Sequence, residues 1–171
     1  MLTTRLITVG ICLMAGTAQA GDAIRDLKIH ARADWPFARA DAEAPKKQDL
    51  SAIRRPTELT ARPPWSELDA LQQVVEKTAT GAVAKLLKSP NIDWEKQMLV
   101  VVTAGSKPTG GWKVNIDSVK VHGKTLKVEW SAIPPSGITT QAFTHPGQVI
   151  LVERFDGPVT FVETAKKGKT P

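Results

Sequence analysis

The sequence predicts an α+β fold in which an antiparallel meander sheet of about five strands packs against one helix or helical pair. Apolar residues recur at helical spacing between residues 68 and 87. After Lys96 the apolar period becomes that of strands, and glycine- or proline-containing turns separate the apolar runs. A helical stretch followed by strands joined by short turns is the pattern that predicts this class.

The first residues have the composition of an export signal. Arg5 gives a positive start, residues 6–15 are an apolar stretch too short to span a membrane, and Ala18-Gln19-Ala20 has the small-residue spacing of a cleavage site. We expect a signal peptide over residues 1–20, cleaved near Ala20, and a periplasmic or secreted mature chain. The alternative is an amphipathic or buried N-terminal helix. No later run approaches the roughly 20 apolar residues that span a bilayer, so no transmembrane segment is predicted.

Composition argues against several classes of function. The single cysteine, Cys12, lies in the expected signal, so the mature chain has no thiol for a disulfide, a metal site or a nucleophile. The formal net charge of the full chain is +6, and the basic residues are dispersed. Export away from cytoplasmic DNA argues against nucleic-acid binding, whereas weak association with anionic envelope polymers is expected. The alternative is an ordinary solvated surface.

Residues 21–50 are predicted to form a weakly ordered N-terminal extension. Residues 38–48 are rich in alanine and charge, which gives little apolar surface to bury, although a strand starting at Ile24 would also fit. One domain is expected over residues 51–164, followed by a basic tail over residues 165–171.

A helix is predicted to follow the first strand of this domain. Ser66 is the expected N-cap, with Asp69 in the capping-box position. The face expected to pack on the sheet carries Leu68, Leu71 and Val75. Gly81 is expected to end or bend the helix, and a second helical segment stops at Ser89-Pro90.

The later apolar runs predict strands. Met98–Val102 is continuously apolar, as expected of a central strand covered on both faces. The alternation that starts at Trp112 changes parity at Asp117-Ser118, which a one-residue β-bulge would explain. His122-Gly123 predicts a tight turn. The last two runs are expected to form a hairpin across Asp156-Gly157-Pro158.

Two polar loops between predicted strands are the candidate binding surfaces. The first, Gly105–Trp112, lacks the lysine and the helix that a phosphate-binding loop needs after its second glycine, so we interpret it as a rigid turn. The second is Thr140–Pro146. Such loops commonly carry function on a sheet scaffold, and the alternative is that the fold itself requires them. The candidate partner-binding residues are Lys107, Pro108, Thr109, Gly110, Gly111, Trp112, Gln141, Phe143, Thr144, His145 and Pro146.

The sequence shows no catalytic or metal-binding constellation. His145 has neither an orienting acid nor a nucleophile beside it in a recognisable motif, and we expect it to bond its own loop. The other histidines, His30 and His122, have no metal-site spacing. The serines lack the Gly-x-Ser-x-Gly context of a nucleophile elbow. We therefore expect no catalytic site, no metal and no cofactor, and predict that the chain is not an enzyme.

The chain has five tryptophans and no tyrosine. Trp94 and Trp130 lie in apolar patterns and are expected in the core. Trp35, Trp65 and Trp112 lie beside prolines or glycines, where they could stack on sugars or anchor a protein interface. The favoured interpretation is that these three cover the ends of the sheet.

The two loops together resemble the C-terminal domain of the PrcB family, named after a subunit of a bacterial protease complex. That family has a Gly-x-x-Pro-Thr-Gly-Gly-aromatic turn, matched here by Gly105–Trp112, and a Thr-Gln-Ala…Thr-x-Pro block, matched by Thr140–Pro146. The likeness extends over about residues 53–161. It implies an exported, non-enzymatic accessory domain associated with a peptidase complex. The founding member's lipidated cysteine has no counterpart, so the resemblance implies no membrane anchor.

The leading hypothesis is therefore an exported binding domain that docks on and stabilises another envelope protein, with a peptidase as the first candidate partner. One alternative is a peptidase inhibitor, because Pro108–Trp112 resembles the wedge loop of chagasin-like cysteine-peptidase inhibitors. A second alternative is recognition of cell-wall glycan through the three tryptophans beside prolines or glycines.

Overall fold

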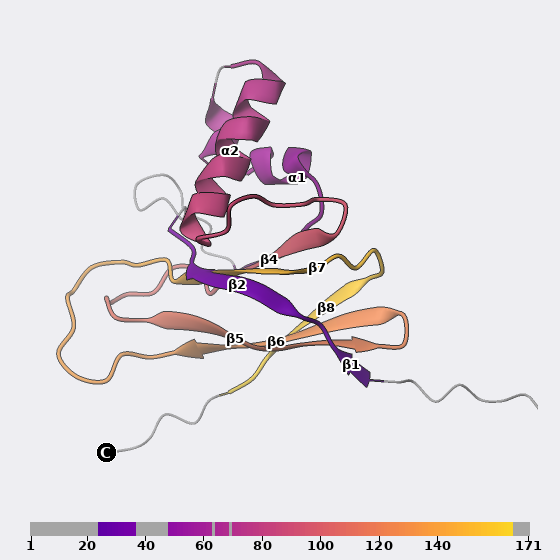
Figure 1. The fold of residues 1–171 in the computed structure, drawn as a ribbon. Coiled ribbons are helices and arrows are strands. Elements are labelled where there is room, and N and C mark those ends of the chain that lie inside the picture. Colours follow the sequence, from indigo (N-terminus) through magenta and orange to yellow (C-terminus); the bar gives the residue numbers. More distant parts are fainter. Residues whose placement is uncertain (1–23, 37–47, 63, 69, 166–171) are drawn as a thin grey trace, which may run out of the picture.

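The computed structural model describes residues 24–36, 48–62, 64–68 and 70–165. These residues form three layers: a four-stranded sheet, a second four-stranded sheet stacked on it, and a helical layer (Figure 1). The expected signal peptide at 1–20 and nearly all of the expected basic tail lie outside the described residues. Within the described residues, no helix is long and apolar enough to cross a bilayer.

Sheet A has the strand order β1-β5-β6-β8. Its strands are β1 (Ile24–Asp26), β5 (Lys113–His122), β6 (Thr125–Ile133) and β8 (Val159–Glu163). Sheet B has the order β2-β7-β4-β3. Its strands are β2 (Ile29–Asp34), β7 (Gly147–Glu153), β4 (Gln97–Thr103) and β3 (Asp49–Ile53). All pairings are antiparallel except that of β6 with β8, which is parallel.

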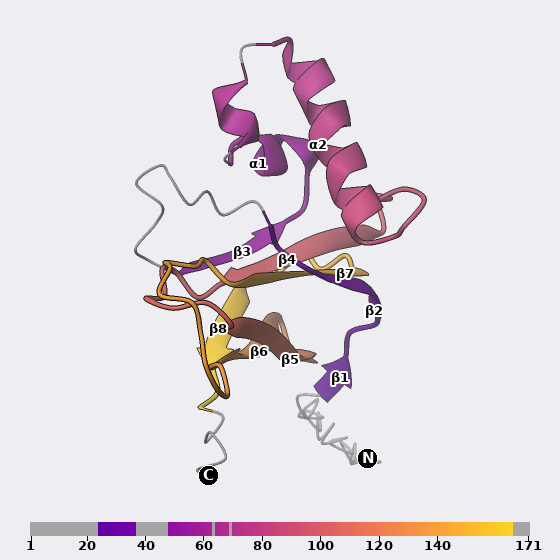
Figure 2. The ribbon, with the colours of Figure 1, turned by 90° about the vertical axis from the view of Figure 1, so that its left-hand side faces the viewer.

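The helical layer covers the outer face of sheet B (Figure 2). It consists of α1 (Pro56–Thr60), the 3₁₀ turn η1 (Trp65–Glu67) and α2 (Gln72–Leu86). Sheet B is therefore the middle layer, and both of its faces are covered.

The alternation of side chains along β4 shows how one strand serves two cores. Met98, Val100 and Val102 point into the core between the sheets. Leu99 and Val101 point the other way, into the core beneath the helices. All five side chains are fully buried. The prediction of a central strand covered on both faces is confirmed. A strand in this position needs apolar side chains on both faces, which explains its continuous apolar run.

The α+β class is confirmed, with eight strands in two sheets rather than about five in one. The predicted last hairpin is wrong. After β7 the turn at Asp156-Gly157-Pro158 carries the chain from sheet B to sheet A, where β8 joins β6. The Arg54 side chain fixes this crossing by donating hydrogen bonds to the carbonyl oxygens of Phe155 and Gly157, both 2.8 Å long.

The predicted irregularities of β5 are confirmed. The register of β5 against β6 shifts between Ile116 and Ser118, which leaves Asp117 as the extra residue of a β-bulge. The two strands join at the tight turn expected after His122, where Gly123 has φ 56°. Glycine adopts this left-handed conformation without the steric cost that other residues meet.

The predicted helix start at Ser66 and the predicted break at Gly81 are wrong, whereas the helical stretch stops before Ser89-Pro90 as predicted. Ser66 lies inside η1, and α2 begins after Leu71, with no side-chain cap. The helix continues through Gly81, whose Cα faces open space. The buried face carries Val75, Ala79, Val83 and Ala84, whereas Leu68, Leu71 and Val74 are exposed. The two alanines of this face carry a weak apolar signal, so the larger Leu68 and Leu71 dominated the predicted face.

The helix ends with a residue in the left-handed conformation, Lys88, at φ 53°. The amide of Ser89 donates to the carbonyl oxygen of Ala84 at 3.0 Å, and the amide of Lys88 donates to that of Lys85 at 3.1 Å. This pair of bonds is a Schellman motif, which satisfies carbonyl groups that the helix itself leaves unpaired.

The stretch expected as a weakly ordered extension contains two strands. β1 pairs with the end of β5, and β2 pairs along β7, so both sheets gain a strand from this stretch. Leu27, between the two strands, is buried in the core between the sheets. Residues 37–47 of the expected extension lie outside the described residues.

Candidate functional site

The two predicted binding loops lie side by side at one end of the sandwich. The first connection, residues 104–112, carries the chain from β4 in sheet B to β5 in sheet A. The second connection, residues 134–146, returns it from β6 in sheet A to β7 in sheet B. Thr103 pairs with Gly147 in one sheet, and Lys113 pairs with Ile133 in the other, so both connections start and finish beside each other. We call them the paired connections.

Backbone hydrogen bonds join the paired connections along their length. Lys107 and Thr144 form an isolated antiparallel bridge in which each amide donates to the other's carbonyl oxygen, at 2.8 and 3.0 Å. The amide of Ala104 donates to the carbonyl oxygen of Pro146 at 3.0 Å, and that of Gly110 donates to Thr140 at 3.0 Å. These bonds continue the β4–β7 pairing irregularly beyond the end of sheet B.

Side chains add further links within the paired connections. The Thr144 hydroxyl donates to the carbonyl oxygen of Thr109 at 2.8 Å. The indole Nε1 of Trp112 donates to the Thr109 hydroxyl at 3.2 Å. Lys107 Nζ lies 5.0 Å from the centroid of the Trp112 ring, within the range of a cation–π contact. The aromatic ring therefore folds back onto its own loop and is half-buried.

The two adjacent glycines allow the connections to approach closely. A Cβ atom on Gly110 would overlap the Thr140 hydroxyl. Gly111 has φ 80°, and a Cβ there would lie 2.9 Å from the Cβ of Pro135. A side chain at either position would push the second connection away, so the glycine pair has a structural role in addition to any contact it makes.

Two large apolar side chains are exposed at this end. Phe143 is 71% exposed and Ile138 is fully exposed, both on the second connection. The second connection is the longer of the two, and its surplus residues project beyond the first. Ile138 was absent from the predicted set, although an isolated apolar residue between Gly137 and Thr139 was the signal that could have identified it.

The structure brings all the predicted partner-binding residues to one end of the sandwich but exposes only some of them. Gly110 is buried. The half-buried positions are Lys107, Thr109, Trp112, Thr144, His145 and Pro146. The exposed positions are Pro108, Gly111, Gln141 and Phe143. Much of the predicted motif thus fixes the shape of the loops, and the smaller exposed set is available for contact.

The histidines do not assemble into a reactive group in the described part of the chain. His145 is half-buried in the second connection, and none of the described hydrogen bonds joins it to an acid or a hydroxyl. His30 lies on β2 and His122 at the end of β5. Across the described residues, no three histidine or acidic side chains are grouped to hold a metal ion.

The tryptophans are mainly structural. Trp130 is buried between the sheets, as predicted, and Trp94 is half-buried against the core beneath the helices. Trp35 and Trp65 are both buried in that second core and meet edge to face, with ring centroids 6.1 Å apart. Of the three tryptophans considered for stacking, Trp112 alone keeps an appreciable exposed area.

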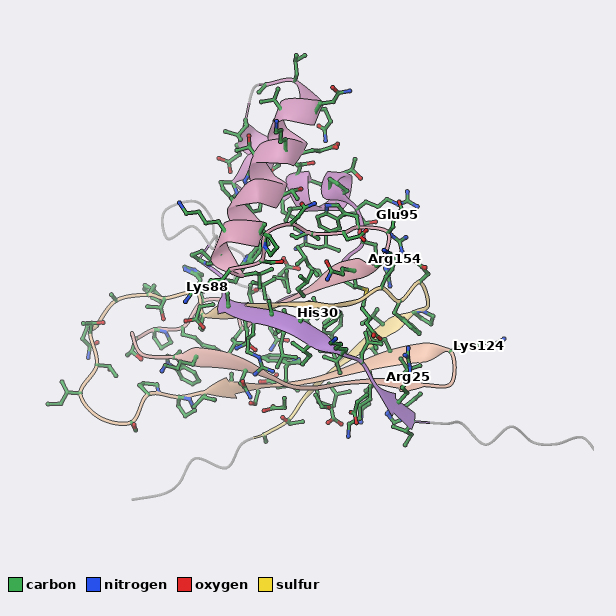
Figure 3. All side chains as sticks on the ribbon, in the orientation of Figure 1. Arg25, His30, Lys88, Glu95, Lys124 and Arg154 are labelled. Carbon is green, nitrogen blue, oxygen red and sulfur yellow. The ribbon has the colours of Figure 1, made fainter. Side chains whose placement is uncertain are left out.

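A mixed-charge groove of about 570 Å³ lies at the end of sheet B where β2 and β4 begin and β7 ends. Glu95 and Arg154, which line it, are at the end of the molecule opposite the paired connections (Figure 3). Two of its cations already have partners, because Arg154 pairs with Asp156 at 2.9 Å and Lys96 pairs with Asp93 at 3.6 Å. Internal pairing of this kind leaves little net charge to attract a ligand.

Comparison with known families identifies the part of the chain that contains this site. Residues 98–153 match the family described as PrcB C-terminal, and this range runs from β4 to β7 and includes both paired connections. No significant match was found among curated proteins or solved structures. The resemblance predicted from the two loop motifs is confirmed over residues 98–153, where the chain is similar to the PrcB C-terminal family.

Proposed function

We propose that the chain is an exported, non-catalytic accessory domain that docks on another envelope protein through the paired connections, with a peptidase as the first candidate partner. The family match supports association with a protease complex. The observation that carries the docking proposal is the mutual backbone bridge of Lys107 and Thr144, which makes one continuous surface of two loops distant in sequence.

The fixed shape of the paired connections favours binding. Loops that are ordered before binding lose less conformational entropy when a partner arrives. The bridge, the Thr144 hydroxyl bond and the folded-back Trp112 ring all restrict the backbone that presents Phe143. A rigid aromatic side chain projecting from such a surface is the kind of residue that dominates interface energies.

The charge of the paired connections indicates the chemistry of the partner surface. Residues 104–112 and 134–146 contain no carboxylate and one charged side chain, Lys107. The Lys107 ammonium lies over the Trp112 ring. The exposed residues are apolar or neutral, so the surface suits an apolar hollow on a protein better than a polyanionic polymer.

Quantitative recovery of partners from native envelope extract tests the proposal. A Phe143→Ser variant is expected to lose at least about tenfold in recovered partner, as removal of an interface anchor does. Leu71→Ser is the matched control, because Leu71 is 80% exposed but lies beside α2 in the helical layer. Equal recovery by both variants would contradict docking through the paired connections.

Assays on the recovered partner separate stabilisation from inhibition. If the partner is a peptidase, we expect addition of the domain to raise its thermal stability or complex yield and to leave its turnover of a small substrate unchanged. Dose-dependent loss of turnover would instead support the inhibitor alternative. Neither result would bear on where the partner docks.

A further inference from the structure

β8 is the edge strand of sheet A that has the longer uncharged run. Each sheet has two edge strands: β1 and β8 in sheet A, β2 and β3 in sheet B. Proteins commonly place charges on edge strands to prevent unwanted pairing with other chains. β1 contains Arg25 and Asp26, β2 has charged residues at exposed positions, and β3 begins with an aspartate. β8 has one charge as well, at its last residue Glu163, and Val159–Val162 is a run of β-branched and aromatic residues without charge, proline or bulge.

Alternate residues of β8 direct their backbone groups away from β6. The amide of Leu126 donates to the carbonyl oxygen of Pro158, and the amide of Thr164 donates to that of Trp130. In a parallel ladder, every second residue bonds the neighbouring strand with both backbone groups. The even-numbered residues of β8 therefore face β6. The backbone amide and carbonyl groups of Val159, Phe161 and Glu163 therefore point away from β6. In the described part of the chain, β8 pairs with no other strand.

We propose that β8 pairs, edge to edge and antiparallel, with the β8 of a second copy of the chain. A two-fold axis at Phe161 places Phe161 opposite its own copy and Val159 opposite Glu163 of the second copy. Every outward amide and carbonyl between 159 and 163 then meets a partner, because the outward positions are symmetric about Phe161. Sheet A would extend across the axis into an eight-stranded sheet, twice its observed four strands.

The charge arrangement favours this self-pairing. Glu163 is the only charged residue of β8, and in the symmetric register it lies opposite a valine rather than its own copy. Like charges directly opposite each other would be destabilising, so the register avoids the one repulsion that the strand contains. The two central phenylalanines would lie across from each other, a pairing that stabilises antiparallel strands.

Sedimentation velocity across a micromolar to millimolar concentration series tests the proposal on the purified full chain. We expect a reversible monomer–dimer equilibrium. Glu163→Pro removes an outward amide that β6 does not use, so the fold is kept while the dimer dissociation constant rises by at least about tenfold. Glu163→Ala is the matched control, since it removes the same carboxylate and its hydrogen bond from Gln48 but keeps the amide. A monomer at all concentrations, or equal effects of the two variants, would overturn the proposal.

A cross-link at the axis tests the register independently of the proline variant. In a Cys12→Ser background, Phe161→Cys should form a disulfide-linked dimer, because directly opposed residues of this type have Cα atoms close enough to bridge. Lys124→Cys, at the exposed hairpin turn, should not. A dimer that persists in the Glu163→Pro variant and shows no cross-link at position 161 would have its contact elsewhere, which would overturn the proposal. This inference is separate from docking through the paired connections, so Phe143→Ser should leave the dimer unchanged.

Discussion

Lys107 and Thr144 lie 37 positions apart in sequence and exchange two backbone hydrogen bonds, of 2.8 and 3.0 Å. This bridge stands outside the named strands, at the point where β4 and β7 have already ended. It joins the Gly-Gly loop to the Thr-Gln-Ala loop, the two motifs on which the family resemblance rests. The two motifs therefore form one structure.

The hydroxyl of Thr144 should contribute measurably to stability. Thr144→Val keeps the shape of the side chain but removes its bond to the carbonyl oxygen of Thr109, so we expect a loss of about 1 kcal/mol in the free energy of unfolding. Urea denaturation measures it. Ser136→Ala, an exposed position on the same connection, is the control and should lie within about 0.5 kcal/mol of the parent. Equal stabilities for the two variants would show that the hydroxyl bond is unimportant.

Gly111 should tolerate no side chain. Its φ of 80° is costly for other residues, and an added methyl would lie 2.9 Å from Pro135. We expect Gly111→Ala to destabilise the fold by roughly 1–3 kcal/mol and to displace the paired connections. Thermal unfolding gives the first effect, and amide chemical shifts of Lys107 and Thr144 report the second. Unchanged shifts at the bridge would contradict the close-packing argument.

Substitution of Gly81 by alanine should stabilise the fold, in contrast to the same substitution at Gly111. It lies in the interior of α2, is exposed, and has no atom within 4 Å of an added Cβ. Gly81→Ala removes backbone freedom from the unfolded chain without a clash, so it should stabilise the protein by roughly 0.5–1 kcal/mol. The midpoint of chemical denaturation measures this, with Gly111→Ala as the contrasting substitution. A destabilised Gly81→Ala variant would mean that the helix is irregular there.

Glu129 should stay ionised to a lower pH than an ordinary glutamate. The hydrogen bond from Lys127, followed by that from Ser118, lowers the pKa of this carboxyl below its ordinary value. A carboxyl pKa that is lower in the folded state stabilises the protein above the unfolded pKa, and this contribution is lost as pH falls through the folded pKa.

Ser118→Ala should therefore raise the pKa of Glu129 toward its ordinary value and reduce the acid sensitivity that this residue contributes. The Ser118 hydroxyl donates to the carboxylate at 2.8 Å. Ser136→Ala is the control, because Ser136 lies on another part of the chain. Carbon-detected NMR titration of the carboxyl measures the shift. A pKa that does not move would assign the lowering to Lys127 and Lys120.

The sequence predicted those features that depend on local pattern. The unbroken apolar run at Met98–Val102 predicted a strand buried on both faces, and the parity change at Asp117-Ser118 predicted a bulge. The similarity of the two loops to the PrcB C-terminal family was also predicted from the sequence, because their turn residues form a specific pattern.

Features that depend on distant partners were not predicted. The turn at Asp156-Gly157-Pro158 marks a change of direction, but nothing local shows that β8 will cross to sheet A. The buried face of α2 contains alanines, whose apolar signal is weak. The exposed leucines were therefore predicted to form the buried face instead. Likewise, only the three-dimensional pairing of the connections shows that Gly110 is buried while Phe143 projects.

Site-specific photo-cross-linking in the intact envelope tests the central claim most directly. A photoreactive residue is placed at Phe143 or, as a control, at Lys124, which lies at the opposite end of the sandwich (Figure 3). We predict that position 143 captures one exported protein in stoichiometric yield and that position 124 does not. Capture of the same protein from position 124 alone, or of none from position 143, would contradict docking through the paired connections.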